Sequence, residues 1–400
     1  KDKGVTAVIT GEQGQNTFTR HGLEEYVSDC VIFLDHRLNN QAATRRLRIV
    51  KYRGSKHGSN EYPTMIDESG LSVLPISSLG LAYPVSAERV STGVDRLDTM
   101  FGGKGYFRGT SILVSGMAGT GKTSLAAAFV QSVCARGEKC LFFAFEESPQ
   151  QILRNMSSIG FDLEKWAMKG LLQFHSVRPS LQGLEAHLVA THRLVKTFKP
   201  STVVMDPVTS LITAGEFVEV KSMLTRVIDF LKNEQITSLF TSLTVGGETP
   251  EESEVGISSL MDTWLRLKMV ENDGEFNRLL YVLKSRGMAH SNQLREFVLT
   301  DQGIELVDVY IGSGQILTGS ARLVQSAKDR AQAVCELQDI ERLRRELEQE
   351  QQALKAQAQT MATRMDNIAK ELQVARQHDK NRQEIAAVDR RGLAASRRAD

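Results

Sequence analysis

Hydrophobic and polar positions change in pattern twice along the chain. Short apolar runs predict a strand-rich region up to residue 74, and alternating strand and helix patterns predict an α/β body over 88–310. Residues 75–87, which contain Pro, Ser and Gly, are typical of a linker between the two. From residue 321 onward Pro, Phe, Tyr and Trp are absent, and the extension 311–400 is predicted to be helical from about residue 320.

Three short apolar runs lie in the body, at residues 111–115 (SILVS), 139–145 (KCLFFAF) and 202–205 (TVVM). Strands that are apolar throughout are buried on both faces, which is typical of parallel sheets covered by helices. The fold class that we expect is therefore α/β with a mainly parallel central sheet.

The tail places apolar residues at a seven-residue spacing from about 325 to 380. One seam position is apolar throughout, whereas the other includes Arg344 and Gln351. We expect a coiled coil, and a single solvated helix packed on the body stays open as the alternative. The first position holds Ile340, Leu347, Leu354, Met361, Ile368 and Ala375, and the second also holds Leu337, Ala358, Met365 and Leu372.

A segment near the end of the first region recurs in the body. Residues 51–54 (KYRG) with His57 match residues 284–287 (KSRG) with His290, at an offset of 233 residues (284 − 51). The same offset pairs Asp29 with Asp262 and Gly70 with Gly303, and a two-residue slip aligns residues 5–10 (VTAVIT) with 236–241 (ITSLFT). Such a collinear series predicts a duplication, in which 1–74 is the C-terminal part of a first copy and the remainder of that copy lies upstream.

Composition narrows the class of protein. The 400 residues are 41% hydrophobic, and 49 Lys and Arg nearly balance 48 Asp and Glu, so no net field attracts nucleic acid or an anionic membrane. The chain shows no signal peptide and no apolar run of about 18 residues. Its four cysteines are scattered. We expect a cytoplasmic protein without a membrane span, a disulfide framework or a zinc site.

Residues 116–123 (GMAGTGKT) match the P-loop pattern GxxxxGK[ST], between a predicted strand and a predicted helix. Its glycines let backbone N–H groups curl round phosphates, Lys122 reaches the β and γ oxygens, and the Thr123 hydroxyl ligates magnesium. ATP and Mg²⁺ are therefore the predicted ligands. The predicted nucleotide-binding residues are Gly116, Gly119, Thr120, Gly121, Lys122, Thr123 and Ser124, together with Asp206 from a later strand.

Three carboxylates end predicted strands of the body. Asp206 closes 202–205 in the Walker B position, beside the magnesium, although an Asp there also serves as a helix cap. Glu146 and Glu147 end 139–145, where one of them can polarise an attacking water or hydroxyl. The alternative is a solvated pair that begins a helix.

These segments together resemble the KaiC family, the duplicated RecA-type ATPases of the bacterial circadian clock. The resemblance covers residues 1 to about 310. Its distinctive segments are 143–148 (FAFEES), 153–155 (LRN), 239–242 (LFTS), 295–297 (REF) and the two KxRG segments. The resemblance implies a RecA-like P-loop fold and a homohexameric ring with ATP between subunits.

In this family the second domain phosphorylates itself on an adjacent Ser-Thr pair that precedes an aspartate. The matching pair is Ser258-Ser259, before Asp262, whereas the first copy has Glu25-Tyr26 at the same offset. The resemblance also implies that Glu146 is the general base, with Glu147 beside it, and that Thr123, Glu146 and Asp206 hold Mg²⁺.

The basic residues that recur in both copies are candidates for contacts in trans, acting as an arginine finger does. A strand-end basic cluster without a ligand is the alternative. The residues implied to contact ATP from the neighbouring subunit are Arg278, Lys284, Ser285, Arg286 and His290 in the second ring, and Arg45, Lys51, Tyr52, Arg53 and His57 in the first.

The tail departs from the family pattern, because the well-known cyanobacterial member ends in a short peptide that a KaiA partner pulls on. A long heptad tail fits pairing of two hexamers into a dodecamer better, so dependence on KaiA is not expected. A KaiB-like protein, bound through the first domain, is the implied partner. Neither nucleic acid nor a membrane is expected.

The motifs of this chain are compatible with three different functions. A RecA-like DNA-dependent ATPase would need a basic loop, but the candidate loop 245–255 (VGGETPEESEV) is acidic and would repel phosphates. A scaffold, in which bound ATP only stabilises the ring, remains an alternative function. The leading prediction is a clock or timer protein that hydrolyses ATP, phosphorylates Ser258 or Ser259 and removes that phosphate again.

Overall fold

The computed structural model describes residues 4–15, 17–39, 42–68, 70–73, 83–244, 256–272, 274–312 and 315–397. The chain divides into two compact units, Lys1–Ala321 and Arg322–Asp400. Most of the expected linker and the whole acidic loop 245–255 lie outside the described residues, so the structure adds nothing on either.

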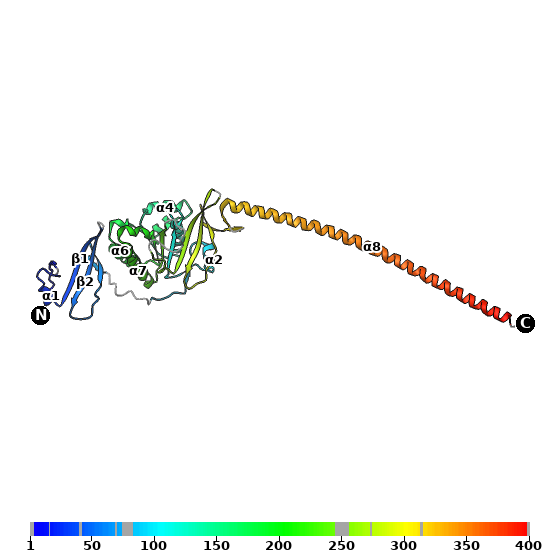
Figure 1. Ribbon diagram of the computed structural model, residues 1–400. Helices are drawn as coiled ribbons and strands as arrows, with labels where there is room; N and C mark the ends of the chain where they lie inside the picture. Colours follow the sequence, from blue (N-terminus) through cyan, green and yellow to red (C-terminus); the bar gives the residue numbers. More distant parts are fainter. Residues whose placement is uncertain are drawn as a thin grey trace. The chain divides into compact units, whose positions relative to one another are not determined.

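The body, coloured from cyan to yellow in Figure 1, is built around a nine-stranded sheet with the strand order β15-β14-β13-β12-β7-β11-β10-β8-β9. The strands from β12 to β9 in this order run parallel, and β13, β14 and β15 extend the sheet in antiparallel fashion. The expected α/β fold with a mainly parallel sheet is therefore confirmed. The strands are β7 (Ser111–Gly116), β8 (Cys140–Ala144), β9 (Leu172–Ser176), β10 (Thr202–Asp206), β11 (Thr237–Leu243), β12 (Thr263–Asn272), β13 (Glu275–Ser285), β14 (Arg295–Thr300) and β15 (Gly303–Asp308).

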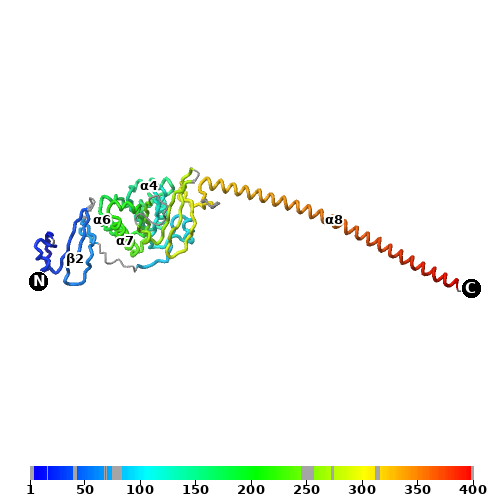
Figure 2. The backbone as a smooth tube through the Cα atoms, viewed as in Figure 1, coloured from blue at the N-terminus to red at the C-terminus, as the bar shows by residue number. Residues whose placement is uncertain are grey.

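Helices cover both faces of the sheet, which explains why its central strands are apolar throughout. Every residue of β7, β8 and β10 is buried. Along β7 the side chains alternate, because Ile112 and Val114 enter the core beneath α3 while Leu113 enters the core beneath α6 and α7. Figure 2 shows α6 and α7 side by side.

The remaining elements of the unit are helices and smaller strands. The helices are α1 (Glu24–Val27), α2 (Asp95–Met100), α3 (Lys122–Ala135), α4 (Pro149–Ser157), α5 (Glu164–Met168), η2 (Pro179–Leu181), α6 (Leu184–Phe198), η3 (Val208–Ala214) and α7 (Phe217–Asn233). The smaller strands are β5 (Arg89–Val90), β6 (Tyr106–Phe107), β16 (Tyr310–Gly312) and β17 (Gln315–Leu317).

The first region forms a four-stranded antiparallel sheet of β1 (Cys30–Asn39), β2 (Ala42–Tyr52), β3 (Glu61–Asp67) and β4 (Gly70–Val73). Shifted by 233 residues, the bounds of β1 and β2 become those of β12 and β13. The β-bulge recurs too, between Val31 and Ile32 in one sheet and between Trp264 and Leu265 in the other. The sequence repeat is therefore a repeat of local structure.

One part of the repeat differs between the two regions. Residues 236–241 lead into and belong to β11, which lies between β7 and β10, whereas the matching residues 5–10 have no regular structure and are exposed. The strands β1 to β4 confirm the expected strand-rich first region, although this segment forms no strand. A strand needs neighbours to pair its backbone groups, and none lies beside residues 5–10 among the described residues.

The tail forms one continuous helix, α8 (Gly319–Ser396), of 78 residues. This confirms the helical prediction from about residue 320. The heptad residues Ile340, Leu347, Leu354 and Met361 are all more than half exposed in the single chain, which is the kind of apolar row that a partner helix covers. No helix among the described residues is long and apolar enough to cross a membrane.

Candidate functional site

The P-loop connects the end of β7 to the start of α3. Gly121 has a φ of +96°, and a Cβ there would lie 2.7 Å from the Phe297 ring. A Cβ on Gly116 would lie 2.7 Å from the carbonyl oxygen of Leu267. Glycine is required at both positions, because the loop packs directly against β12 and β14. Thr120, Lys122 and Ser124 are buried at the loop and the first turn of α3.

Lys122 lies folded over its own loop. Its Nζ donates to the carbonyl oxygens of Gly116 at 2.9 Å and of Met117 at 2.7 Å. Burial lowers the pKa of this ammonium group, while the carboxylates of Asp206 and Glu146 oppose the shift. The lysine charge therefore has both carboxylates in its neighbourhood.

Asp206 ends β10 and joins two neighbouring elements. The Thr123 hydroxyl donates to its Oδ2 at 2.7 Å, and the Thr241 hydroxyl of the adjacent β11 donates to its Oδ1. Burial raises the pKa of Asp206, and the two hydroxyl donors oppose the rise. A carboxylate and a hydroxyl in contact at the end of a P-loop are oxygen donors that suit Mg²⁺, so the residues present fit this ion.

Glu146 and Glu147 follow β8 at the same edge of the sheet. The Ser210 hydroxyl in η3 donates to Glu146 Oε1 at 2.6 Å, and Asn155 in α4 donates to Glu147 Oε2 at 3.2 Å. The chain after them is fixed by Ser148, which caps α4 in a capping box with Gln151. The two carboxylates are thus oriented by different elements, and the pKa effects on Lys122 and Asp206 place both near the P-loop.

Ser258 and Ser259 lie in a turn directly before β12. Lys284 Nζ donates to the carbonyl oxygens of Ser258 at 3.1 Å and of Ser259 at 3.4 Å. Arg286 Nη2 donates to the carbonyl oxygen of Ser259 at 2.8 Å. Burial lowers the pKa of Lys284, and the nearby Arg286 charge lowers it further. Both cations of the KxRG segment therefore hold the backbone of this turn, which we call the acceptor turn (residues 257–261).

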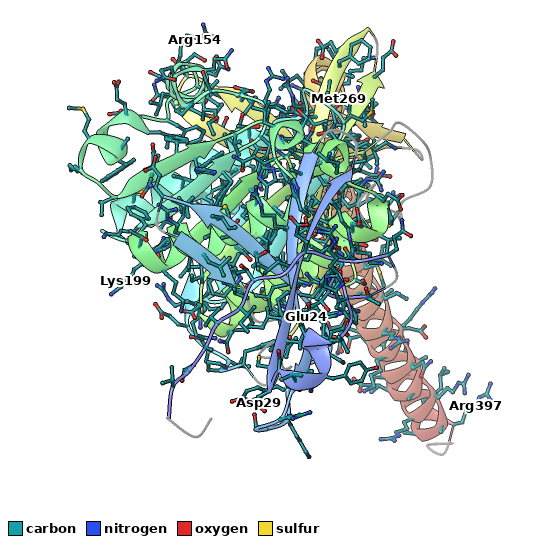
Figure 3. The ribbon with its side chains drawn as sticks, turned by 90° about the vertical axis from the view of Figure 1, so that its left-hand side faces the viewer. Glu24, Asp29, Arg154, Lys199, Met269 and Arg397 are labelled. Carbon is teal, nitrogen blue, oxygen red and sulfur yellow. The ribbon has the colours of Figure 1, made fainter. Side chains whose placement is uncertain are left out.

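The first region makes the same contacts at the same offset. Lys51 Nζ donates to the carbonyl oxygens of Glu25 at 2.7 Å and of Tyr26 at 3.2 Å, and Arg53 Nη2 donates to that of Tyr26 at 3.0 Å. In this region Glu25 and Tyr26 belong to the short helix α1, and Figure 3 labels its first residue, Glu24, and the following Asp29. The KxRG contacts therefore belong to both repeats, while the serine pair belongs to one.

The P-loop and the acceptor turn lie at opposite ends of β7. Thr263, just after the acceptor turn, pairs with Ile112 near the start of β7, whereas the P-loop begins at its last residue, Gly116. Six strand residues separate these ends by about 17 Å. One chain does not bring its own P-loop and its own serine pair together.

Arg278 lies apart from the other basic residues of its group. Its Nε donates to the carbonyl oxygen of Gly119 in its own P-loop at 3.1 Å, and its strand partner is Met269, labelled in Figure 3. Lys284 and Arg286 lie at the other end of β13.

The other predicted residues of this group are placed as follows. In the first region Arg45 lies on β2, several residues before Lys51 and Tyr52, and His57 is exposed. Ser285 contacts the Thr263 hydroxyl at 3.3 Å, and His290 is half-buried in the following loop.

Sequence reasoning missed three residues that orient the predicted carboxylates. Thr241 contacts Asp206, Ser210 contacts Glu146 and Asn155 contacts Glu147. Thr241 and Asn155 occur in the distinctive segments LFTS and LRN. The sequence therefore marked these segments, but it did not indicate which side chains Thr241 and Asn155 contact. Only the order of strands β10 and β11 places Thr241 beside Asp206.

A mainly parallel sheet with a P-loop after β7 and a carboxylate at the end of β10 defines a RecA-like P-loop ATPase. The sequence matches the family described as "ATPase: KaiC" over residues 1–78 and 90–310. The chain belongs to the KaiC family.

Individual relatives differ in how much of the chain they match. The chain is 51% identical over 399 residues to the circadian clock protein KaiC2 of Synechocystis sp., covering 99% of this chain and 70% of that protein. It is 37% identical over 325 residues to the circadian clock oscillator protein KaiC of Parathermosynechococcus lividus and 36% identical to that of Synechococcus elongatus. These two alignments cover 80% of this chain and 60% and 62% of the relatives, so the chain spans less than two thirds of their length.

Proposed function

We propose that the protein is a KaiC-like clock or timer ATPase and autokinase, which transfers the γ-phosphate of ATP to Ser258 or Ser259 of a neighbouring chain in a homohexamer and later removes it. In this proposal residues 1–74 are the C-terminal part of a first ATPase domain, 75–87 a linker, 88–310 a second ATPase and kinase domain, and 311–400 an extension with a coiled coil. The relatives named as clock proteins support this function.

The observation that carries the proposal is the separation of the P-loop from the acceptor turn within one chain. The two lie at opposite ends of β7, about 17 Å apart along the strand. Phosphoryl transfer needs the reacting oxygen within about 3.5 Å of the phosphorus. This geometry supports transfer between chains, in which the acceptor turn of one chain meets the P-loop of the next.

The residues would divide the work as follows. The P-loop backbone and Lys122 bind the phosphates of ATP, and Lys284, Ser285, Arg286 and His290 approach from the neighbour. Arg278 instead lies against Gly119 of its own P-loop. Magnesium would be held by Thr123, Glu146 and Asp206 and would neutralise phosphate charge. Glu146 takes the proton as the acceptor Oγ forms a bond to the γ-phosphorus and the bond to the ADP oxygen breaks. Arg45, Lys51, Tyr52, Arg53 and His57 would take the equivalent places in the first ring.

Replacing the serine pair tests the acceptor assignment. The double variant Ser258→Ala/Ser259→Ala should lose nearly all protein-bound label after incubation with [γ-³²P]ATP and Mg²⁺, because no acceptor hydroxyl is left in the turn. The matched control is Ser157→Ala/Ser158→Ala, an exposed adjacent serine pair at the end of α4. If the acceptor variant incorporates as much label as its control, the assignment of the acceptor fails.

Removing the tail tests the proposed assembly. We propose that two hexamers pair through α8 into a dodecamer, because its apolar heptad row is exposed in the single chain. The mass of the particle formed with ATP should correspond to twelve chains for the full chain. For a chain that ends at residue 321, the particle mass should correspond to six chains. Equal numbers of subunits in both particles would contradict the role of the tail.

The proposed partners follow from the family and from the tail. A KaiB-like protein is the partner that we propose for the first domain. The KaiC2 relative aligns over 399 residues, hence through the long tail, whereas the oscillator relatives align over 325. We therefore propose that a KaiA-like protein is not required, and that the protein acts in the cytoplasm without nucleic acid.

A further inference from the structure

Asp262 directly follows the acceptor turn, and its side chain is bound by two distant elements. Its Oδ2 accepts hydrogen bonds from the backbone N–H and the hydroxyl of Ser111, each at 2.9 Å. The same oxygen lies 2.7 Å from Lys232 Nζ. The side chains of Lys232 and Asp262 are only 12% and 17% exposed, so this is a largely desolvated ion pair.

These contacts tie the turn to rigid structure. Ser111 is the first residue of β7, and Lys232 lies in the last turn of α7. The backbone adds two further bonds, from Asp262 N to the Ser111 carbonyl at 3.0 Å and from Arg286 N to the Asp262 carbonyl at 2.8 Å. The ammonium group of Lys232 also lies 5.9 Å from the centre of the Tyr83 ring. The end of the acceptor turn therefore has little freedom to move.

The backbone bond of this aspartate occurs in both repeats. In the first region it runs from Arg53 N to the Asp29 carbonyl at 2.9 Å. The side chain of Asp29 lies 3.7 Å from that of Arg53, and these two side chains are 48% and 55% exposed. The ion pair between Lys232 and Asp262 is shorter and far less exposed.

We propose that Lys232 and Asp262 are positioning residues for phosphoryl transfer, which hold the hydroxyls of Ser258 and Ser259 in register with the nucleotide of the neighbouring chain. The inference rests on the proposed autokinase function. Lys232 touches neither nucleotide nor acceptor oxygen and acts through Asp262, which stands three residues after Ser259. Misplacement of a reacting group by about 1 Å costs about a hundredfold in rate, so loosening the turn should slow transfer strongly.

Three variants of the full chain test this proposal. Lys232→Met removes the charge and keeps the length, Asp262→Asn keeps an oxygen for the Ser111 bonds and removes the ion pair, and Lys232→Arg restores a cation. The matched control is Lys196→Met, because Lys196 forms an equally short pair of 2.6 Å with Glu234 at the end of α7, away from the acceptor turn. Particle mass and binding of a fluorescent ATP analogue establish which variants assemble.

The readouts are the rate of label incorporation, the ratio of phosphate on Ser258 to that on Ser259 by mass spectrometry, and ATP hydrolysis. Lys232→Met and Asp262→Asn should incorporate label roughly ten- to a hundredfold more slowly, with a shifted ratio, while hydrolysis changes much less. Lys232→Arg should recover most of the rate, and Lys196→Met should match the parent.

Either of two results would overturn the positioning role. If Lys232→Met or Asp262→Asn assembles and labels at the parental rate with the parental ratio, the positioning role is wrong while the kinase assignment stands. If hydrolysis falls as far as labelling, the pair serves general stability and the positioning role is again wrong. Failure of the kinase itself shows separately, as undiminished labelling of Ser258→Ala/Ser259→Ala.

Discussion

Replacing Lys122 by Met should reduce ATP hydrolysis and protein phosphorylation together by about 10²- to 10³-fold, because the variant loses the charge that stabilises the transferred phosphoryl group. Lys122 is the buried cation of the P-loop, with its Nζ within 2.9 Å of two loop carbonyl oxygens. Methionine fills the same space without that charge. Both activities should fall because both use the same bound nucleotide.

The matched control for this experiment is Lys104→Met, which removes an exposed lysine from the same domain. Hydrolysis of ATP by both variants is measured as phosphate release at saturating ATP and Mg²⁺. If Lys122→Met hydrolyses ATP and incorporates label at the same rates as the parent protein, the P-loop at 116–123 is not the catalytic nucleotide site.

Replacing Glu146 by Gln should slow phosphorylation by about 10²- to 10⁴-fold, the usual contribution of a general base. The amide oxygen of Gln can still accept the bond from Ser210, which is 2.6 Å long in the parent, so the local structure should survive. What the variant loses is the ability to take a proton from the acceptor hydroxyl. Label incorporation is measured beside particle mass, and an intact particle without label is the expected result.

The informative comparison is Glu147→Gln. Glu147 is held by Asn155 on α4, in a different direction from Glu146, and its replacement should cost less. A larger loss in Glu147→Gln than in Glu146→Gln would exchange the roles of the two carboxylates. Parental labelling by Glu146→Gln would show that Glu146 is not the general base.

Local features of the site could be predicted from the sequence, because each depends on neighbours in the chain. The P-loop follows a strand and opens a helix, Asp206 ends the apolar strand β10, and Glu146 closely follows the apolar strand β8, as the pattern indicates. The sheet was predictable for the same reason, since buried parallel strands are apolar throughout. The long helix was also predictable, because its composition excludes Pro and aromatic residues.

Contacts that depend on strand order or on distant helices were not predictable. Lys232 is one polar residue on an amphipathic helix, and nothing in its neighbourhood indicates that it meets Asp262. Arg278 belongs by offset to the basic residues of the repeat, yet the antiparallel course of β13 carries it to its own P-loop. Residues 5–10 resemble a strand in composition, but pairing depends on neighbouring strands.

The most direct test of the central claim mixes two inactive chains. Lys122→Met keeps the serine pair without a working P-loop, and Ser258→Ala/Ser259→Ala keeps the P-loop without acceptors, so each should label poorly alone. Co-assembled in one particle and distinguished by a mass tag, they should show label on Ser258 or Ser259 of the Lys122→Met chain, supplied by its neighbour. If mixed particles of confirmed composition leave that chain unlabelled while the parent labels fully, transfer between chains is contradicted.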